Sequence, residues 1–301
     1  IGIRVASNPL HLSPEDWYRW RGFQGNPTSI MVDGYRALQD GNTTYVAAAN
    51  ILQPGQSIYS NIYLISRNPD ASPVTVGIYQ QMVKTLAFNI NLTTEVSNVC
   101  ETGNDPNVYG TGQYLPKGVS KAIACSTDAT CLAYGDDTHC GSFKLKLARD
   151  TVRLADYQQM SRSIESYRVS HNSYPKLDAG TFLQGFATTR WSSWTDELSK
   201  DVGETLPKDP INLFLTCGRC SESQAVCTAD SECPSGQTCK AQTVGSATYD
   251  PQACWDNVQR RYLCPKVGVS PSHIYQYRSV DGGARYEISS EFEIPKSFFD
   301  E

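Results

Sequence analysis

The sequence lacks a long apolar run and an excess of charge of one sign. No stretch of its 301 residues approaches the ~18 consecutive apolar residues that a membrane-spanning helix needs. Lysine and arginine number 26 against 31 aspartates and glutamates, a net charge of −5 without long runs of like charge. Proteins that bind a nucleic-acid backbone or an anionic membrane carry a basic patch, so we expect no nucleic acid among the partners of this protein.

The sequence also lacks the short motifs of the common enzyme classes. His-Glu-x-x-His, Gly-x-Ser-x-Gly and the glycine loops that bind phosphates are all absent, and the four histidines lie in unlike contexts. A cysteine nucleophile needs a nearby base and a group that stabilises the thiolate, whereas the cysteines here lie in clusters that we expect to be oxidised. We therefore expect a protein that is not an enzyme. An exported hydrolase, with acids and histidines gathered in one pocket, is an alternative.

Cysteine is missing from residues 1–99 and crowded after them. This density is typical of an oxidising compartment, where disulfides worth about 2–4 kcal/mol each stabilise segments that bury little apolar surface. The chain begins with Ile1, which we interpret as a mature or trimmed form, and Asn42 and Asn91 open two N-glycosylation sequons. We expect an extracellular or cell-surface protein. The eleven disulfide candidates are Cys100, Cys125, Cys131, Cys140, Cys217, Cys220, Cys227, Cys233, Cys239, Cys254 and Cys264.

Two of the cysteine segments repeat one motif. Residues 125–131 and 227–233 both have the form Cys-x2-Asp-x2-Cys, and each is followed by one more cysteine, Cys140 or Cys239. The spacing leaves the connectivity open, and Cys254 with Cys264 is one candidate pair. Four cysteines precede the long helix predicted below and seven follow it. A disulfide therefore joins the two groups, or one thiol is free, or one cysteine pairs between subunits.

Metal binding is the alternative to disulfides. Cys217-x2-Cys220 could supply two zinc ligands, but no second pair stands at zinc-finger spacing. Calcium could be held by acids of the cysteine segments, although their spacing does not match the twelve-residue EF-hand loop. We assign no metal ligand and no cofactor. The acids in question are Asp128, Asp136 and Asp137, or Asp230 and Glu232.

Residues 1–99 are predicted to form an α+β domain with a β-meander. Strand-like runs cover residues 29–32, 35–38, 43–48 and 57–66, and Asp33-Gly34 and Asp40-Gly41-Asn42 separate the first three with hairpin signals. A helix is predicted before them, from Ser13-Pro14. Ser72-Pro73 begins a second helix with one apolar face.

Residues 100–143 are predicted to form a disulfide-rich connector, and residues 144–170 the longest helix of the chain. The apolar stripe of this helix needs a surface to pack against, and its members are Leu147, Leu154, Tyr157, Met160 and Ile164. We interpret the charged residues of the helix as a solvated face. They are Arg149, Asp150, Arg153, Asp156, Arg162, Glu165 and Arg168.

The third domain spans residues 144–301. After the long helix we predict a short helix at 192–202, an extended turn at 206–210, a cysteine-rich insertion at 217–264 and a hairpin of residues 274–280 and 285–293. The predicted fold class is α+β.

The order of these pieces carries a family resemblance. It rests on residues 148–156 and 164–167 of the helix, Asn172-Ser173-Tyr174-Pro175, Leu206-Pro207-Lys208-Asp209-Pro210, Tyr275-Gln276-Tyr277 and Tyr286-Glu287-Ile288. Over about residues 145–293 the chain resembles type IV pilins and the pseudopilins of type II secretion. The resemblance implies a helix packed on an antiparallel sheet and a globular unit exposed on a filament.

The sequence departs from this family at two points. A 140-residue region precedes the helix where the family has a hydrophobic stem, so polymerisation through the stem does not carry over. Asp281-Gly282-Gly283 is too short and too poor in carboxylates to match the calcium loop of major pseudopilins. From the resemblance and the cysteines we expect a structural subunit of a bacterial extracellular filament or surface assembly. Its partners would be copies of itself, with other surface proteins or glycans as further partners.

Aromatic residues supply the rival hypothesis. Tyrosine, phenylalanine and tryptophan number 17, 9 and 5, and they cluster around Trp17, Tyr18, Trp20 and Phe23 and again at Trp191 and Trp194. Such clusters are usually core, yet they also suit stacking on sugars. A surface-anchored adhesin that binds glycans is therefore the alternative function.

Overall fold

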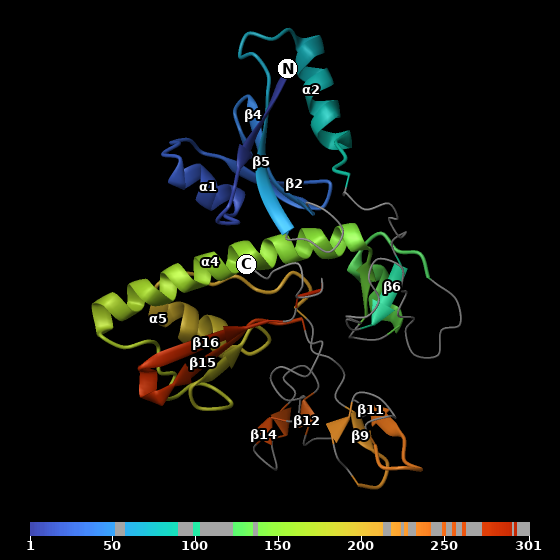
Figure 1. The fold of residues 1–301 in the computed structure, drawn as a ribbon, viewed down its shortest axis with the longest axis vertical. Helices are drawn as coiled ribbons and strands as arrows, with labels where there is room; N and C mark the ends of the chain where they lie inside the picture. The colour runs from blue at the N-terminus through green and yellow to red at the C-terminus, as the bar shows by residue number, and fades with distance from the viewer. Residues whose placement is uncertain are drawn as a thin grey trace.

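The computed structural model describes residues 1–51, 58–89, 99–102, 123–134, 138–212, 218–223, 226–227, 233–241, 249–250, 255–256, 261–262, 273–290 and 292–293. Within this part of the chain, one long helix, α4 (Phe143–His171), runs between two antiparallel sheets (Figure 1). The predicted α+β class is confirmed.

The N-terminal sheet has five antiparallel strands in the order β1-β5-β4-β3-β2. Asp33 and Gly34, which join β2 to β3, both have positive φ, as the sequence signal for a tight hairpin requires. Among the described residues the first strand lies at one edge of the sheet and pairs with β5, in the register Ile3 to Ile65. The strands are β1 (Gly2–Ser7), β2 (Thr28–Val32), β3 (Tyr35–Asp40), β4 (Thr43–Ile51) and β5 (Ile58–Ser66).

Helices cover both faces of this sheet because its strands alternate two sets of apolar side chains. Val46 and Ala48 of β4 belong to one core cluster, which α2 (Pro73–Thr85) covers with Tyr79. Tyr45 and Ala47 point to the other face, where α1 (Pro14–Trp20) packs with Trp17 and Tyr18. The sheet is therefore the middle layer of a three-layer unit.

Helix α4 is capped at both ends. The Ser142 hydroxyl accepts a hydrogen bond from the Leu145 amide at 3.1 Å. At the other end Asn172 takes a left-handed conformation, and its amide donates to the Arg168 carbonyl. Its 29 residues give a rod of about 43 Å. No helix of the described residues is both long and apolar enough to cross a membrane.

The C-terminal sheet lies on the other side of α4. Its strand order is β16-β15-β8, formed by β8 (Phe186–Thr188), β15 (Gln276–Val280) and β16 (Arg285–Ser289). The predicted hairpin of β15 and β16 is confirmed, and Asp281, Gly282 and Gly283 make its turn with positive φ. The predicted short helix consists of a π-helical turn (Trp194–Ser199) followed by α5 (Lys200–Val202).

The cysteine-rich segments form smaller units. In the first, β6 (Val99–Thr102) pairs with β7 (Thr138–Gly141), beside α3 (Asp128–Cys131) and a 3-10 turn (Leu132–Tyr134). The second contains β9 (Gly218–Cys220), β10 (Val226–Cys227) and β11 (Cys239–Ala241). A third pairs β12 (Tyr249–Asp250), β13 (Trp255–Asp256) and β14 (Arg261–Tyr262).

The apolar stripe of α4 packs against two surfaces, whereas the sequence suggested a single one. Leu147 is fully buried in the core of the N-terminal sheet, whereas Met160 and Ile164 are buried against the C-terminal sheet. Leu154 and Tyr157, between them, are only half-buried. The helix predicted to open the third domain therefore also contributes to the core of the first unit.

We predict that Leu147→Ala destabilises the protein by about 2–5 kcal/mol, because it leaves a cavity in the core of the N-terminal sheet. Val169→Ala is the matched control on the same helix, since Val169 is 87 % exposed, and it should stay within about 0.5 kcal/mol of the parent. Urea unfolding measures both. Equal effects of the two substitutions would contradict the packing of α4 on this sheet.

Candidate functional site

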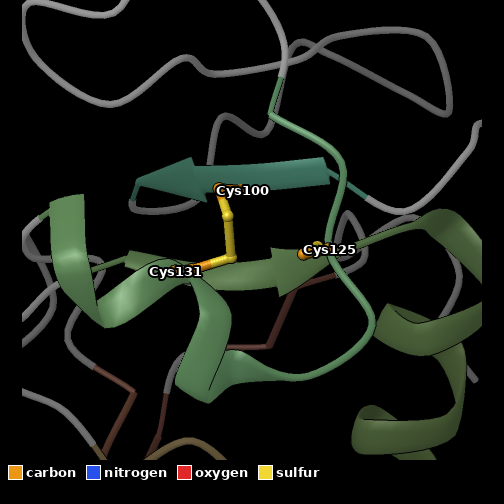
Figure 2. A group of neighbouring side chains, drawn as sticks. All are labelled: Cys100, Cys125 and Cys131. Carbon is orange, nitrogen blue, oxygen red and sulfur yellow. A yellow bond between two sulfur atoms is a disulfide. The ribbon is translucent and has the colours of Figure 1, made fainter.

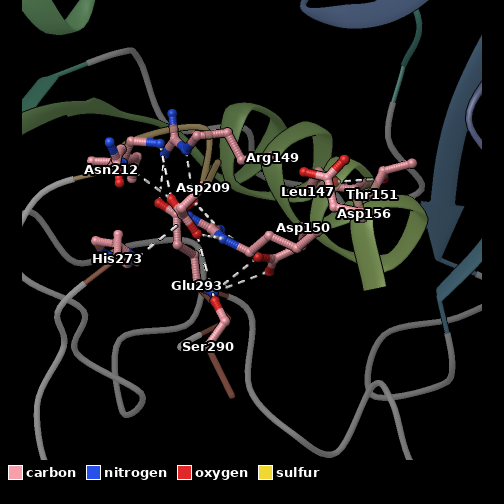
Figure 3. Close-up of polar contacts among 12 residues, drawn as sticks. Leu147, Arg149, Asp150, Thr151, Asp156, Asp209, Asn212, His273, Ser290 and Glu293 are labelled. Atoms are coloured by element: carbon pink, nitrogen blue, oxygen red, sulfur yellow. Dashed lines mark hydrogen bonds and ion pairs between the residues drawn. The ribbon is translucent and has the colours of Figure 1, made fainter. Parts of the chain in front are cut away.

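A cluster of charged side chains is enclosed along α4 (Figure 3). The side chains of Asp150 and Arg153 are 0 % exposed, and Asp156, Asp209 and Glu293 are buried as well. Charged groups of this kind are seldom buried unless they are paired, so their partners define the site.

Arg153 is the centre of the cluster. Its Nε and Nη2 bind the two carboxylate oxygens of Asp209 at 2.7 and 3.0 Å, a bidentate pair. Its Nη1 donates to Asp150 and to Glu293, both at 2.7 Å. One guanidinium therefore joins α4 to the turn before residue 210 and to the segment after β16.

Glu293 fixes the chain that follows the C-terminal sheet. Its carboxylate accepts hydrogen bonds from Arg149 at 2.6 and 2.5 Å as well as from Arg153. Its backbone amide donates to both oxygens of Asp150 at 3.1 Å. The Nδ1 atom of the buried His273 lies 3.4 Å from Nη2 of Arg153.

Asp156 extends the network to the N-terminal sheet. One of its oxygens accepts from Arg36 of β3 at 2.8 Å, and the other accepts from the Tyr275 hydroxyl at 2.7 Å. Arg36 precedes α4 by more than one hundred residues, and Tyr275 lies just before β15. The N-terminal sheet and the residue that leads into β15 are thus bonded to the same side chain of the helix between the two sheets.

The local charges move the pKa values of the acids in opposite directions. Burial alone raises the pKa of Glu293, but Arg149 and Arg153 outweigh it and hold that pKa well below its usual range. Arg153 likewise outweighs burial at Asp209 and lowers its pKa. Burial, helped by the neighbouring Glu293 carboxylate, raises the pKa of Asp150 to about 7 although Arg153 opposes the change. The cluster thus combines two carboxyl groups whose pKa is lowered with one whose pKa is raised to about 7.

The interpretation of the α4 charges as a solvated face is wrong for Asp150, Arg153 and Asp156, which are buried. Arg149 is also mostly enclosed, with 12 % of its side chain exposed. Residues 150, 153, 157, 160 and 164 step by three and four, so the charged positions continue the stripe that contains Met160 and Ile164. This spacing was the signal in the sequence that could have shown that Asp150 and Arg153 are buried. The remaining charged members of the predicted face, Arg162, Glu165 and Arg168, are exposed or half-buried.

The cluster has residue types that a hydrolase uses, three carboxylates and a histidine around one point. Its carboxylates are bound by arginines, and the exposure of Asp209, His273 and Glu293 is only 3, 3 and 4 %. A substrate would have to displace these ion pairs to reach the acids. The geometry fits a role in holding segments together better than a role in chemistry.

The first cysteine unit contains two neighbouring disulfides, Cys100–Cys131 and Cys125–Cys140. The sulfurs of Cys100, Cys125 and Cys131 lie within 4.8 Å of one another (Figure 2). This spacing suits a metal, but a sulfur in a disulfide is not the thiolate that zinc requires. Asp128, a calcium candidate, instead accepts a hydrogen bond from the Cys140 amide at 2.8 Å.

The second cysteine unit repeats features of the first. Cys100 faces Cys140 across β6 and β7, and Cys220 faces Cys239 across β9 and β11 in the same antiparallel way. Cys220 is bonded to Cys233, as Cys100 is to Cys131, and Cys239 is also in a disulfide. The motif repeat in the sequence is thus a structural repeat. With Cys220 oxidised, the Cys217-x2-Cys220 zinc pair lacks one of its thiolates.

Eleven is an odd number of cysteines, and the disulfides show on which side of α4 the extra one lies. All four cysteines before α4 pair with one another, so no disulfide joins them to the seven that follow the helix. The odd cysteine belongs to the later group. The pair Cys254 with Cys264, the side chains of Cys217 and Cys227, and the calcium candidates Asp136, Asp137, Asp230 and Glu232 lie outside the described residues, as does Asn91.

The predicted aromatic clusters are mostly core. Trp17, Tyr18, Trp191 and Trp194 are 1–4 % exposed, and the indole of Trp194 donates to the Pro207 carbonyl at 3.1 Å. Trp20 and Phe23 differ, because 63 and 41 % of them are exposed. Asn42 lies half-buried in the turn between β3 and β4.

Comparison of the chain with protein-family models, with curated proteins and with solved structures finds no match. The disulfides among the described residues indicate an oxidising compartment.

We predict that Asp150→Asn removes one component of the pH dependence of stability. The pKa of Asp150 is about 7 in the folded protein against 3.8 for the free group, so the folded state keeps a proton that the unfolded state has lost. The free energy of unfolding of the parent therefore contains a part that falls as the pH rises from about 4 to about 7.

The variant, which stays uncharged, should lack that decline in urea unfolding measured across this range. Asp70→Asn, at an exposed position, serves as the control and should keep the parent profile. Superimposable profiles for the parent and Asp150→Asn would refute the assignment.

Proposed function

We propose that this protein is a non-enzymatic structural subunit of a bacterial extracellular filament or surface assembly. The observation that carries the proposal is the edge strand β1. Ile3 and Val5 of this strand are 57 and 53 % exposed, and Ile1, which precedes it, is 52 % exposed. Among the described residues β1 has a strand partner on one side only.

An open strand edge with apolar side chains is a template for pairing with another chain. The opposite edge of the sheet, β2, is also open within the described part of the chain and carries Met31, which is 61 % exposed. Two open edges allow each copy to contact two neighbours, which is the minimum for a polymer. The terminal strand proposed for assembly is paired with β5 of its own sheet, so assembly would extend that sheet.

The helix and its sheet support the pilin-like part of the proposal. A long helix packed on an antiparallel sheet is the architecture that the family resemblance implies, and α4 lies in this way against β8, β15 and β16. Two of the motifs that carry the resemblance, 56 residues apart, meet in the bidentate pair of Arg153 with Asp209.

The disulfides support a location outside the cell. Cys100, Cys131 and Cys140 are at most 1 % exposed and form the small core of their unit together with Ile123 and Cys125. Reduction would remove most of what holds such a unit, because it buries few other apolar side chains. A structural subunit exposed at the cell surface gains durability from covalent links of this kind.

We predict that the full chain forms concentration-dependent polymers through the edge of its N-terminal sheet. Sedimentation velocity and negative-stain microscopy of the oxidised protein should show them. Ile3→Lys combined with Val5→Lys should shift the population to monomers, because charges on an edge strand oppose pairing.

Ile78→Lys is the matched control, since Ile78 is a 56 % exposed apolar residue of a helix, α2, and not of an edge strand, and it should polymerise like the parent. Monomers at every concentration, or unchanged polymers in the double variant, would contradict the proposal.

A further inference from the structure

A groove between α1 and α4 has the features of a ligand site. It has a volume of about 570 Å³, within the range of about 300–1,000 Å³ that is typical of ligand clefts. Its two sides come from the N-terminal unit and from the helix that also packs on the C-terminal sheet. Sites for small molecules often lie at such junctions.

One wall of the groove is apolar and aromatic. Trp20, the last residue of α1, lines it together with Leu10, and the two are 63 and 52 % exposed. The neighbouring Trp17 and Tyr18 are buried in the core, whereas Trp20 is the most exposed member of its cluster, ahead of Phe23 at 41 %. The Arg21 guanidinium lies 5.7 Å from the Trp20 ring centre. An exposed indole beside a groove offers a flat apolar face at low entropic cost.

The other wall is a row of hydrogen-bonding side chains on α4. Gln158, Arg162 and Ser166 are four residues apart, so they lie in line along one face of the helix, and all three are exposed. Gln159 is held by Glu204, which accepts a hydrogen bond from its amide at 3.0 Å. This wall therefore presents an amide, a guanidinium and a hydroxyl opposite the indole.

The charges of the side chains that line the groove balance. Arg19 and Arg162 both bind Asp16, each at 2.6 Å, and Glu204 is the second carboxylate. Two cations against two anions give an anionic ligand such as a phosphate no net attraction. The two exposed apolar side chains are also too few for a wholly apolar ligand.

We propose that this groove binds a neutral saccharide. A pyranose ring has an apolar face of C–H groups, which would stack on Trp20, and a rim of hydroxyls that both donate and accept hydrogen bonds. Amide, guanidinium and hydroxyl groups on the α4 wall match that rim. The site is independent of the strand edge assigned to assembly, so a filament subunit would also act in attachment to glycans.

The test is binding of the full oxidised chain to a glycan array that carries neutral, sialylated and sulfated oligosaccharides. Binding of neutral glycans is the expected result. Trp20→Ala and Gln158→Ala should each weaken it at least tenfold. Tyr134→Ala should leave it unchanged, because Tyr134 is an exposed aromatic residue outside the groove, in the first cysteine unit.

Circular dichroism and thermal unfolding of each variant separate loss of the site from loss of the fold. If Trp20→Ala unfolds the chain, Gln158→Ala decides, because its side chain lies on the exposed face of α4. No binding to the array, binding to anionic glycans alone, or binding that survives both groove substitutions would overturn the proposal. If the protein is monomeric but binds neutral glycans, the assembly function is contradicted and the proposal for the groove is supported.

Discussion

The enclosed guanidinium of Arg153 is the group on which the rest of the structure depends. It has no contact with solvent, and three carboxylates surround it, from α4 itself, from the turn at Asp209 and from the segment at Glu293. Removing one partner from a buried ion pair costs about 3–5 kcal/mol, because the other charge is left uncompensated. The three segments therefore have to be in place at the same time. Asp156 likewise needs Arg36 of the N-terminal sheet as its partner.

Such a network is a poor source of net stability, since apolar replacements of buried ion pairs are often as stable. What it supplies is a unique arrangement. An apolar contact between α4 and its neighbours could slide by a turn, whereas the bidentate geometry of Arg153 with Asp209 allows one register only. The apolar cores on either side of α4 and the disulfides of the cysteine units supply stability, and the charges determine how the parts are placed.

The local features of this fold were largely predictable from the sequence. The hairpin turns at Asp33-Gly34 and Asp281-Gly282 followed from residues that tolerate positive φ, and the 29-residue helix followed from its apolar period. The ion network was not predictable in the same way. Its partners are up to 144 residues apart, and nothing in the sequence near Glu293 marks it as the acceptor for two arginines. Charges at positions 150 and 153 fit a solvated face as well as a buried one until their partners are placed.

The disulfide pairing and the groove could not be predicted from the sequence, for a related reason. The motif repeat indicated two similar cysteine units, but which sulfurs meet depends on strand pairing between β6 and β7 and between β9 and β11. In the same way, Trp17, Tyr18 and Trp20 are all large aromatic residues, and the sequence does not tell them apart. Only the packing of α1 on the sheet leaves Trp20 exposed.

The measurement that tests the central role of Arg153 most directly is a double-mutant cycle with Asp209. Free energies of unfolding would be measured for the parent, Arg153→Met, Asp209→Asn and the double variant. The ion-pair account predicts that each single change is strongly destabilising and that the double variant is little worse than either, with a coupling of more than about 1 kcal/mol. Effects that add to within about 0.5 kcal/mol would contradict it.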